Sequence, residues 1–193
     1  MLNLTQEEII SAFNNKNSYS NQITEIKIIT TAVSIIFLTG EFAYKINKPL
    51  NLGFLDFSTL EKRKEQCTKE LKQNFLISPQ LYLTVVKLIQ ENNTFKIVEL
   101  NHSGTALEYA LKMRQLDPEK TMDKLLIKGL ITQDQIKKIA ERIFKFHQIA
   151  PINSEISSYG NLETIKYNWN ENFQQTEKYI NKIITKEDFR FIQ

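Results

Sequence analysis

The sequence predicts an α+β fold, in which an antiparallel sheet carrying one long helix is followed by an incomplete set of helices. Two observations favour this class. Short segments rich in β-branched residues, with apolar residues at alternate positions, fill the first part of the chain around one charged helical segment. Beyond about Met113 the apolar residues recur at helical spacing. We therefore expect residues 1–113 to hold the sheet and an N-terminal helix, and residues 114–193 to be helical.

Capping boxes mark the helices of the first region. Thr5 with Glu8 precedes apolar residues at helical spacing, so a first helix should begin there. Ser58 with Glu61 forms a second box, and the long helix that it starts should run to about Asn74.

The strands of this region are bounded by turn-forming residues. Gly40 and Glu41 form a tight turn that joins two of them into a hairpin, and Pro49 ends the second. Strands are expected over residues 24–29, 33–38, 42–46, 81–89, 94–100 and 106–113.

The pattern of the second region predicts helices joined by loops. A short helix over residues 122–129 should stop at its glycine, and Thr132 with Gln135 should cap a longer one. Residues 150–161 are polar and predict a loop. A last helix is expected from about Leu162 to Ile184.

Composition excludes several classes of protein. The net charge is only +3 and the basic residues are scattered, which argues against a nucleic-acid partner. Cys67 is the single cysteine, so an intrachain disulfide is impossible and a cysteine metal site is not expected. The most apolar window, residues 32–44, is interrupted and too short to cross a bilayer, so we expect no membrane partner. The start of the chain shows no signal peptide, which favours the cytoplasm.

Lys45 lies in the strand segment FAYKI, residues 42–46. Alternation places the two aromatic residues and Ile46 on one face, and Ala43 and Lys45 on the other. A covering helix would bury one set or the other, and the sequence leaves both open. If the second face is covered, a small residue beside a lysine leaves room for a flat ligand, with the ammonium aimed at its phosphates. The alternative is an ordinary solvent-facing lysine.

Glu70 lies on the long helix that follows. Leu60, Cys67, Leu71 and Asn74 form one narrow stripe at helical spacing, and Glu70 lies at the edge of that stripe. A carboxylate in this position can reach a strand lysine and hold it in place. A solvated glutamate with no such role is the alternative.

The order of these elements resembles the small lobe of a protein-kinase-like fold. The amino-acid sequence of these segments resembles, more narrowly, the N-terminal kinase-like domain of bacterial aminoglycoside-phosphotransferase-type proteins. In that family the domain is often followed by a P-loop kinase domain. The resemblance runs from about residue 24 to residue 182, and its most specific part is FAYKIxKPxxxGFLDFSTLExR at residues 42–63. It implies a kinase-like small lobe over residues 1–113 and a partial large lobe over residues 114–193.

The resemblance also implies roles in binding ATP. Lys45 would contact the α- and β-phosphates, and Glu70 would be its ion-pair partner. Gly40 would sit in the hairpin turn that covers the nucleotide. The backbone from Leu111 to Met113 would form the hinge that hydrogen-bonds adenine, and Asp123 would lie near the ribose or the substrate.

The catalytic parts of such a phosphotransferase are missing from the sequence. Phosphoryl transfer needs an acid or base near the attacking hydroxyl and carboxylates that hold Mg²⁺. His102 and His147 have no aspartate beside them, and Asp188 in the motif DFR lacks the glycine of a metal-binding Asp-Phe-Gly. A Walker A motif is also absent. We assign no catalytic residue and no metal ligand.

Two hypotheses follow. The first is a phosphotransferase truncated before its catalytic loop, either a gene remnant or one half of a split protein, which contacts ATP but is inactive alone. The second is a non-catalytic interaction module that needs no ATP. Exposed apolar residues such as Trp169, Phe173 and Ile180 on the last helix would favour an oligomer, a separate partner chain or marginal stability.

Overall fold

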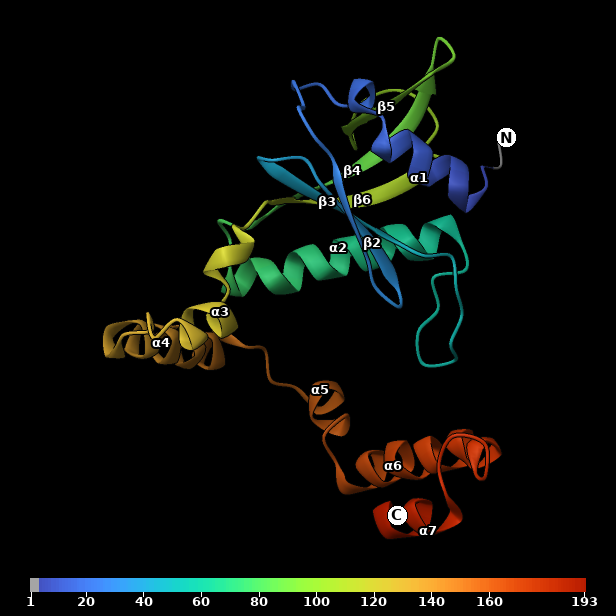
Figure 1. Ribbon diagram of the computed structural model, residues 1–193, viewed down its shortest axis with the longest axis vertical. Coiled ribbons are helices and arrows are strands. Elements are labelled where there is room, and N and C mark those ends of the chain that lie inside the picture. The colour runs from blue at the N-terminus through green and yellow to red at the C-terminus, as the bar shows by residue number, and fades with distance from the viewer. Residues whose placement is uncertain (1–3) are drawn as a thin grey trace. The chain divides into compact units, whose positions relative to one another are not determined.

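The computed structural model describes residues 4–193 and confirms the α+β class (Figure 1). The described chain divides into two compact units, one that ends at Phe146 and one from His147 to Gln193. All six predicted strands form, and they make one antiparallel sheet in the first unit in the order β1-β2-β3-β6-β4-β5. The strands are β1 (Lys27–Thr30), β2 (Ser34–Leu38), β3 (Phe42–Asn47), β4 (Tyr82–Glu91), β5 (Thr94–Glu99) and β6 (Glu108–Arg114).

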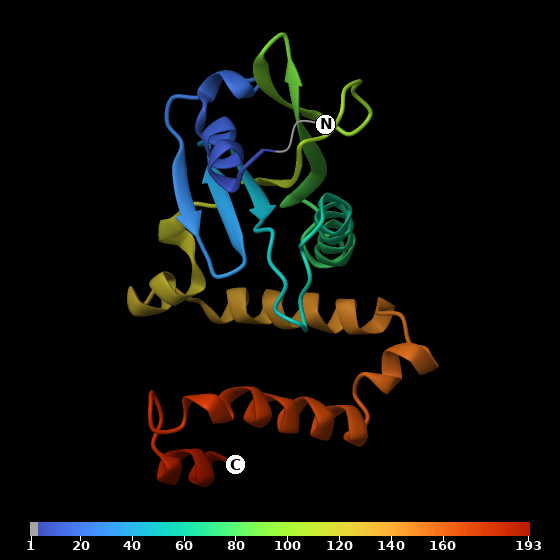
Figure 2. The ribbon, with the colours of Figure 1, turned by 90° about the vertical axis from the view of Figure 1, so that its right-hand side faces the viewer.

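Helices cover both faces of this sheet, as Figure 2 shows for α1 (Gln6–Asn14) and α2 (Leu60–Ile77). On the face that carries α1, Tyr44 and Ile46 join a core in which the rings of Phe13 and Phe37 stack at 5.1 Å. On the face that carries α2, Lys45 meets the helix. The two alternatives that the sequence left open for β3 are therefore both realised.

The helix α1 begins as predicted, because Thr5 and Glu8 form a complete capping box. The expected cap of α2 was wrong by one residue. Thr59, not Ser58, caps the helix and accepts a hydrogen bond from the amide of Lys62. Ser58 is instead engaged by the carboxylate of Asp56, which accepts from both its amide and its hydroxyl.

A buried ion pair joins α2 to the sheet. The Nε of Arg63 donates to both carboxylate oxygens of Glu108 at 2.9 Å, and another guanidinium nitrogen donates to the carbonyl of Phe57. The amide of Tyr109 completes the shell of the carboxylate. Arg63 and Glu108 are 7% and 1% exposed, so this pair has all its hydrogen-bond partners inside the protein.

The chain after β6 is helical, with α3 (Met122–Ile127), α4 (Gln133–Ile149) and α6 (Leu162–Thr176) in the predicted places. Thr132 and Gln135 form the expected capping box of α4. The loop expected over residues 150–161 was wrong in part, because Asn153 caps a short helix, α5 (Ser154–Ser158). Within residues 4–193 no helix has the length and apolar content needed to cross a bilayer.

The single last helix that we expected up to Ile184 was also wrong. The helix α6 ends at Thr176, a 3₁₀ turn covers Glu177–Tyr179, and α7 follows at Lys186–Ile192. Asn181 lies in the left-handed region at φ 62°, and Thr185 caps α7 through the amide of Asp188. A left-handed residue and a new cap end one helix and begin another, although the apolar spacing continues through them.

Candidate functional site

An ion pair between β3 and α2 forms the centre of the candidate site. The ammonium nitrogen of Lys45 lies 2.7 Å and 2.8 Å from the two carboxylate oxygens of Glu70. The side chains are 23% and 16% exposed, so the pair is shielded but still in contact with solvent. The strand and the helix thus bring together the lysine and the glutamate that the sequence singled out.

The geometry leaves Lys45 able to bind a further group. An ammonium has three N–H donors, and the two oxygens of Glu70 occupy two of them. The third remains for an acceptor such as a phosphate oxygen. The carboxylate also fixes the lysine side chain in place, so less conformational entropy is lost when a ligand binds.

Apolar side chains surround this pair on the same face of the sheet. Cys67, Val85 and Leu111 are buried there, with Tyr82 and Met113 packed against them. In the register of the sheet, Lys45 lies opposite Leu111, and Ala43 lies opposite Met113. A small residue and apolar side chains therefore lie beside a partly exposed cation, a combination that suits a flat ring with a phosphate attached.

Burial changes the acidity of two groups in this cluster. It raises the pKa of the Cys67 thiol to about 12, with the charge of Glu70 adding to the effect. The pKa of Tyr82 is also raised, first by burial and then by Glu70. Both side chains stay protonated at neutral pH, so neither supplies a nucleophile or a base.

Gly40 lies in the turn between β2 and β3, at the Phe42 end of β3. Its φ of 98° is one that only glycine adopts readily, and its amide donates to the side-chain oxygen of Gln115 at 2.8 Å. This hydrogen bond joins the turn to the chain just after β6. The turn leads into β3 at Phe42, three residues before Lys45. Whether it covers a nucleotide stays a prediction.

The expected hinge, from Leu111 to Met113, lies within β6, between β3 and β4. Its backbone groups take part in the sheet, while the side chains of Leu111 and Met113 join the cluster near Lys45. The chain leaves the sheet after Arg114, where the amide of Gln115 donates to the carbonyl of Glu41. The role of this segment in holding adenine stays a prediction.

Asp123 lies in the first turn of α3. A hydrogen bond from Thr121 holds the pKa of this exposed carboxyl below its ordinary value. The groups that act on this carboxyl all lie close to it in the sequence, and Lys45 is not among them.

One residue beside the ion pair, Asn47, was not singled out from the sequence. Asn47 is buried on β3, where its side-chain oxygen accepts from the hydroxyl of Ser34 and its amide reaches the sulfur of Cys67. Asn47 thus holds β2, β3 and α2 together beside the ion pair. The alternation of residues 42–46 predicted its face but not its partners.

His102 and Asp188, which were considered for catalysis or metal binding, make local contacts. A nitrogen of the His102 ring lies 2.7 Å from the carbonyl oxygen of Ser103, and Asp188 bonds to Thr185 at the start of α7. Across residues 4–193, no group of three or more His, Cys, Asp and Glu side chains is arranged to hold a metal ion.

Comparison with known proteins gives mycobacterial relatives whose descriptions name no activity. Proteins of Mycobacterium bovis and Mycobacterium tuberculosis, each described as an uncharacterized protein, are 26% identical over 168 residues. The match covers 87% of this chain but 32% of each relative, so the chain spans about a third of their length. No family model matches the chain, and no solved structure does.

Proposed function

We propose that this chain binds ATP on the α2 face of its sheet, as the nucleotide-contacting part of a kinase-like phosphotransferase of the aminoglycoside-phosphotransferase type. The single observation that carries the proposal is the ion pair of Lys45 and Glu70, with one donor of the ammonium unused. The apolar side chains of Leu111 and Met113 would lie against the base.

A comparison within α2 supports a binding role for this pair. Arg63 and Glu108 are almost fully buried, and protein groups satisfy both of them, as a purely structural pair requires. Lys45 and Glu70 are partly exposed and have no third partner in the described chain. The partial exposure and the unused donor of Lys45 therefore leave room for a phosphate, which the enclosed pair of Arg63 and Glu108 does not.

We further propose that the chain does not transfer the phosphate by itself. The sequence has no loop of the His-Gly-Asp type and no later metal-binding aspartate. The proton acceptor and the Mg²⁺ ligands would have to come from another polypeptide or from a longer form of the protein. The phosphate acceptor would be chosen by that part as well.

Calorimetric titration with ATP, with and without Mg²⁺, tests the proposal. Lys45→Met should weaken binding about 10- to 100-fold, since a hydrogen bond to a charged group contributes about 1.5–3 kcal/mol. Glu70→Gln should weaken it less, because the lysine remains. Lys69→Met removes the same charge from an exposed position on α2 and serves as the matched control. No ATP binding, or equal binding by wild type and Lys45→Met, would refute the proposal.

A second candidate function rests on α4. Ile136, Ile139, Ile143 and Phe144 lie at helical spacing and are 43% to 62% exposed. We propose that these side chains bury against another polypeptide, either a separate chain or a second copy, which would make the protein an interaction module. If the partner is a second copy, light scattering should show self-association that Ile143→Glu abolishes; if it is a separate chain, the wild type should capture it and Ile143→Glu should not. A wild-type monomer that captures no partner would count against this function.

A further inference from the structure

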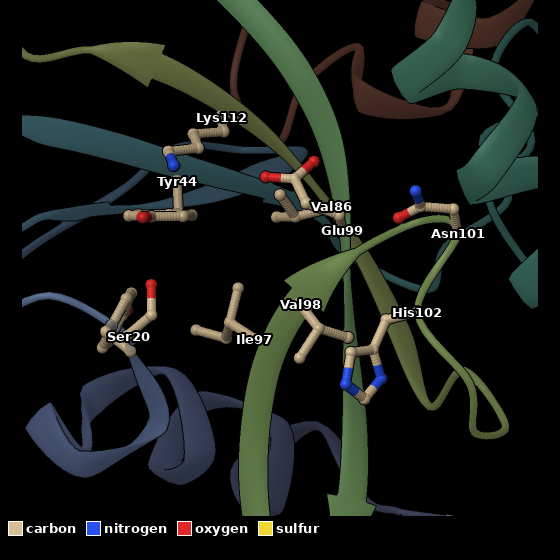
Figure 3. Close-up of a pocket in the computed structure, with 10 residues that line it drawn as sticks. Ser20, Tyr44, Val86, Ile97, Val98, Glu99, Asn101, His102 and Lys112 are labelled. Atoms are coloured by element: carbon tan, nitrogen blue, oxygen red, sulfur yellow. The ribbon is translucent and has the colours of Figure 1, made fainter.

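A cleft of about 490 Å³ lies on the α1 face of the sheet, opposite the face that carries Lys45 and Glu70 (Figure 3). Its apolar part comes from β4 and β5, through Val86, Ile97 and Val98. Polar side chains come from Tyr44 on β3, Lys112 on β6, Glu99 at the end of β5, the chain just after β5, and the segment that precedes β1. The volume lies in the range of sites for small molecules.

The hydroxyl of Tyr44 is the first sign that this cleft takes a ligand. Tyr44 is 3% exposed, and its hydroxyl has no hydrogen-bond partner in residues 4–193. Among the described residues, only the hydroxyl of Ser18 is both buried and unpaired, so the hydroxyl of Tyr44 is open to the cleft and can bond to water or to a ligand there. Tyr19, whose ring packs edge-on against Tyr44, does bond its hydroxyl to the carbonyl of Phe13. The cleft is therefore where a partner for Tyr44 would enter.

Two opposite charges at the cleft are the second sign. The ammonium of Lys112 lies 4.3 Å from the ring centroid of Phe42 and 5.9 Å from that of Tyr44. Glu99 lines the same cleft from β5. Within the described chain neither side chain forms an ion pair, with the other or with any other residue. The aromatic rings thus hold the cation in place while both charges stay available.

We propose that this cleft binds a free α-amino acid with a large apolar side chain. The ligand carboxylate would meet Lys112 and the hydroxyl of Tyr44, the ligand ammonium would meet Glu99, and the apolar side chain would lie on Val86 and Ile97.

A ligand with a single charge fits these groups less well. A simple anion would be repelled by Glu99, and a simple cation would be repelled by Lys112. Only a zwitterion places a charge of the correct sign against each residue. The apolar lining adds a preference for leucine or phenylalanine over small or polar amino acids.

Titration of the whole chain with L-phenylalanine, followed through the methyl signals of Val86 and Ile97, tests the proposal. The expected result is saturable binding at millimolar or lower concentration. Phenethylamine and 3-phenylpropanoate, which each keep one charge, should bind at least about 10-fold more weakly, equivalent to ~1.4 kcal/mol.

Variants of the cleft assign the contacts. Lys112→Met and Glu99→Gln should each weaken binding about 10-fold. Lys112→Met keeps the aliphatic chain over Phe42, and circular dichroism checks that it folds. Tyr44→Phe is the third variant; it removes only the hydroxyl and should weaken binding as well, by less than the loss of either charge. Lys45→Met, on the opposite face, should leave amino-acid binding unchanged.

Three results would overturn the proposal. These are the absence of binding at roughly 10 mM ligand, equal binding of the singly charged analogues, and binding that all three cleft variants leave intact.

Discussion

At the scale of single residues, α2 takes part in two ion pairs with different tasks, Arg63 with Glu108 and Glu70 with Lys45. Arg63 is enclosed with Glu108 and satisfied by protein groups, whereas Lys45 keeps a donor free beside Glu70. Burial raises the pKa of the Glu108 carboxyl, and the hydrogen bond from Arg63 opposes that shift. Glu108 therefore depends on Arg63 to remain charged inside the protein.

Removal of Arg63 should be strongly destabilising. Arg63→Met leaves the carboxylate of Glu108 buried without its partner, and we expect the free energy of unfolding to fall by about 3–5 kcal/mol. Urea denaturation measures the change. The double variant Arg63→Met with Glu108→Leu should recover most of the loss, because no charge is then buried. A single variant as stable as the wild type would contradict this account.

The buried tyrosines should make the protein sensitive to alkali. Burial, with help from Glu99 and Glu41, raises the pKa of Tyr44 from its ordinary 10.0 to about 12. Burial and the neighbouring Tyr44 raise the pKa of Tyr19 as well. A raised pKa favours the neutral form in the folded state, so this contribution to stability is complete below pH 10.0 and is lost as the pH rises towards about 12.

Denaturation at a series of alkaline pH values tests this expectation. The free energy of unfolding should decline above pH 10.0, and Tyr44→Phe should flatten the decline because phenylalanine does not ionise. An identical decline in the variant would show that other groups are responsible.

At the scale of elements, α2 closes one face of the sheet over Cys67. The thiol is 1% exposed, and burial raises its pKa to about 12. Only the thiolate reacts readily with alkylating agents. We therefore expect iodoacetamide to modify Cys67 only when α2 detaches from the sheet.

A time course of alkylation, with and without denaturant, measures this opening. Modification in the native protein should be at least about 100-fold slower than in urea, since opening that costs ~2.7 kcal/mol already gives that factor. Reaction at the rate of a free thiol in native conditions would show that α2 does not cover Cys67.

Helix starts were predictable from the sequence wherever one local pattern was decisive. Thr5 with Glu8 and Thr132 with Gln135 each offered a single capping box, and both form. Ser58 and Thr59 both suit a cap, and the carboxylate of Asp56 decides between them by binding Ser58.

The candidate site was predictable only in part, for a similar reason. Helical spacing turned Glu70 towards the packed edge of α2, where it meets Lys45. The face of β3 that a helix covers could not be read, because α1 covers one face and α2 the other. The pair of Arg63 and Glu108 joins residues 45 positions apart, and no local pattern marks such a contact.

At the scale of the whole molecule, the first unit contains the complete sheet and both candidate sites. The proposed nucleotide site lies on the α2 face, and the proposed amino-acid cleft lies on the α1 face. The mycobacterial relatives are about three times as long as the part that matches this chain. We propose that phosphate transfer, if it occurs, needs groups outside residues 1–193, while nucleotide binding does not.

Determining which face of the sheet ATP contacts is the measurement that tests the central claim most directly. Methyl-labelled protein titrated with ATP reports each face separately, because Leu111 and Met113 lie on the α2 face, whereas Val86 and Ile97 lie on the α1 face. The account predicts saturable shifts of the Leu111 and Met113 methyl signals, lost in Lys45→Met, with the α1-face signals unmoved. No shifts at roughly 10 mM ATP, or shifts confined to Val86 and Ile97, would contradict it.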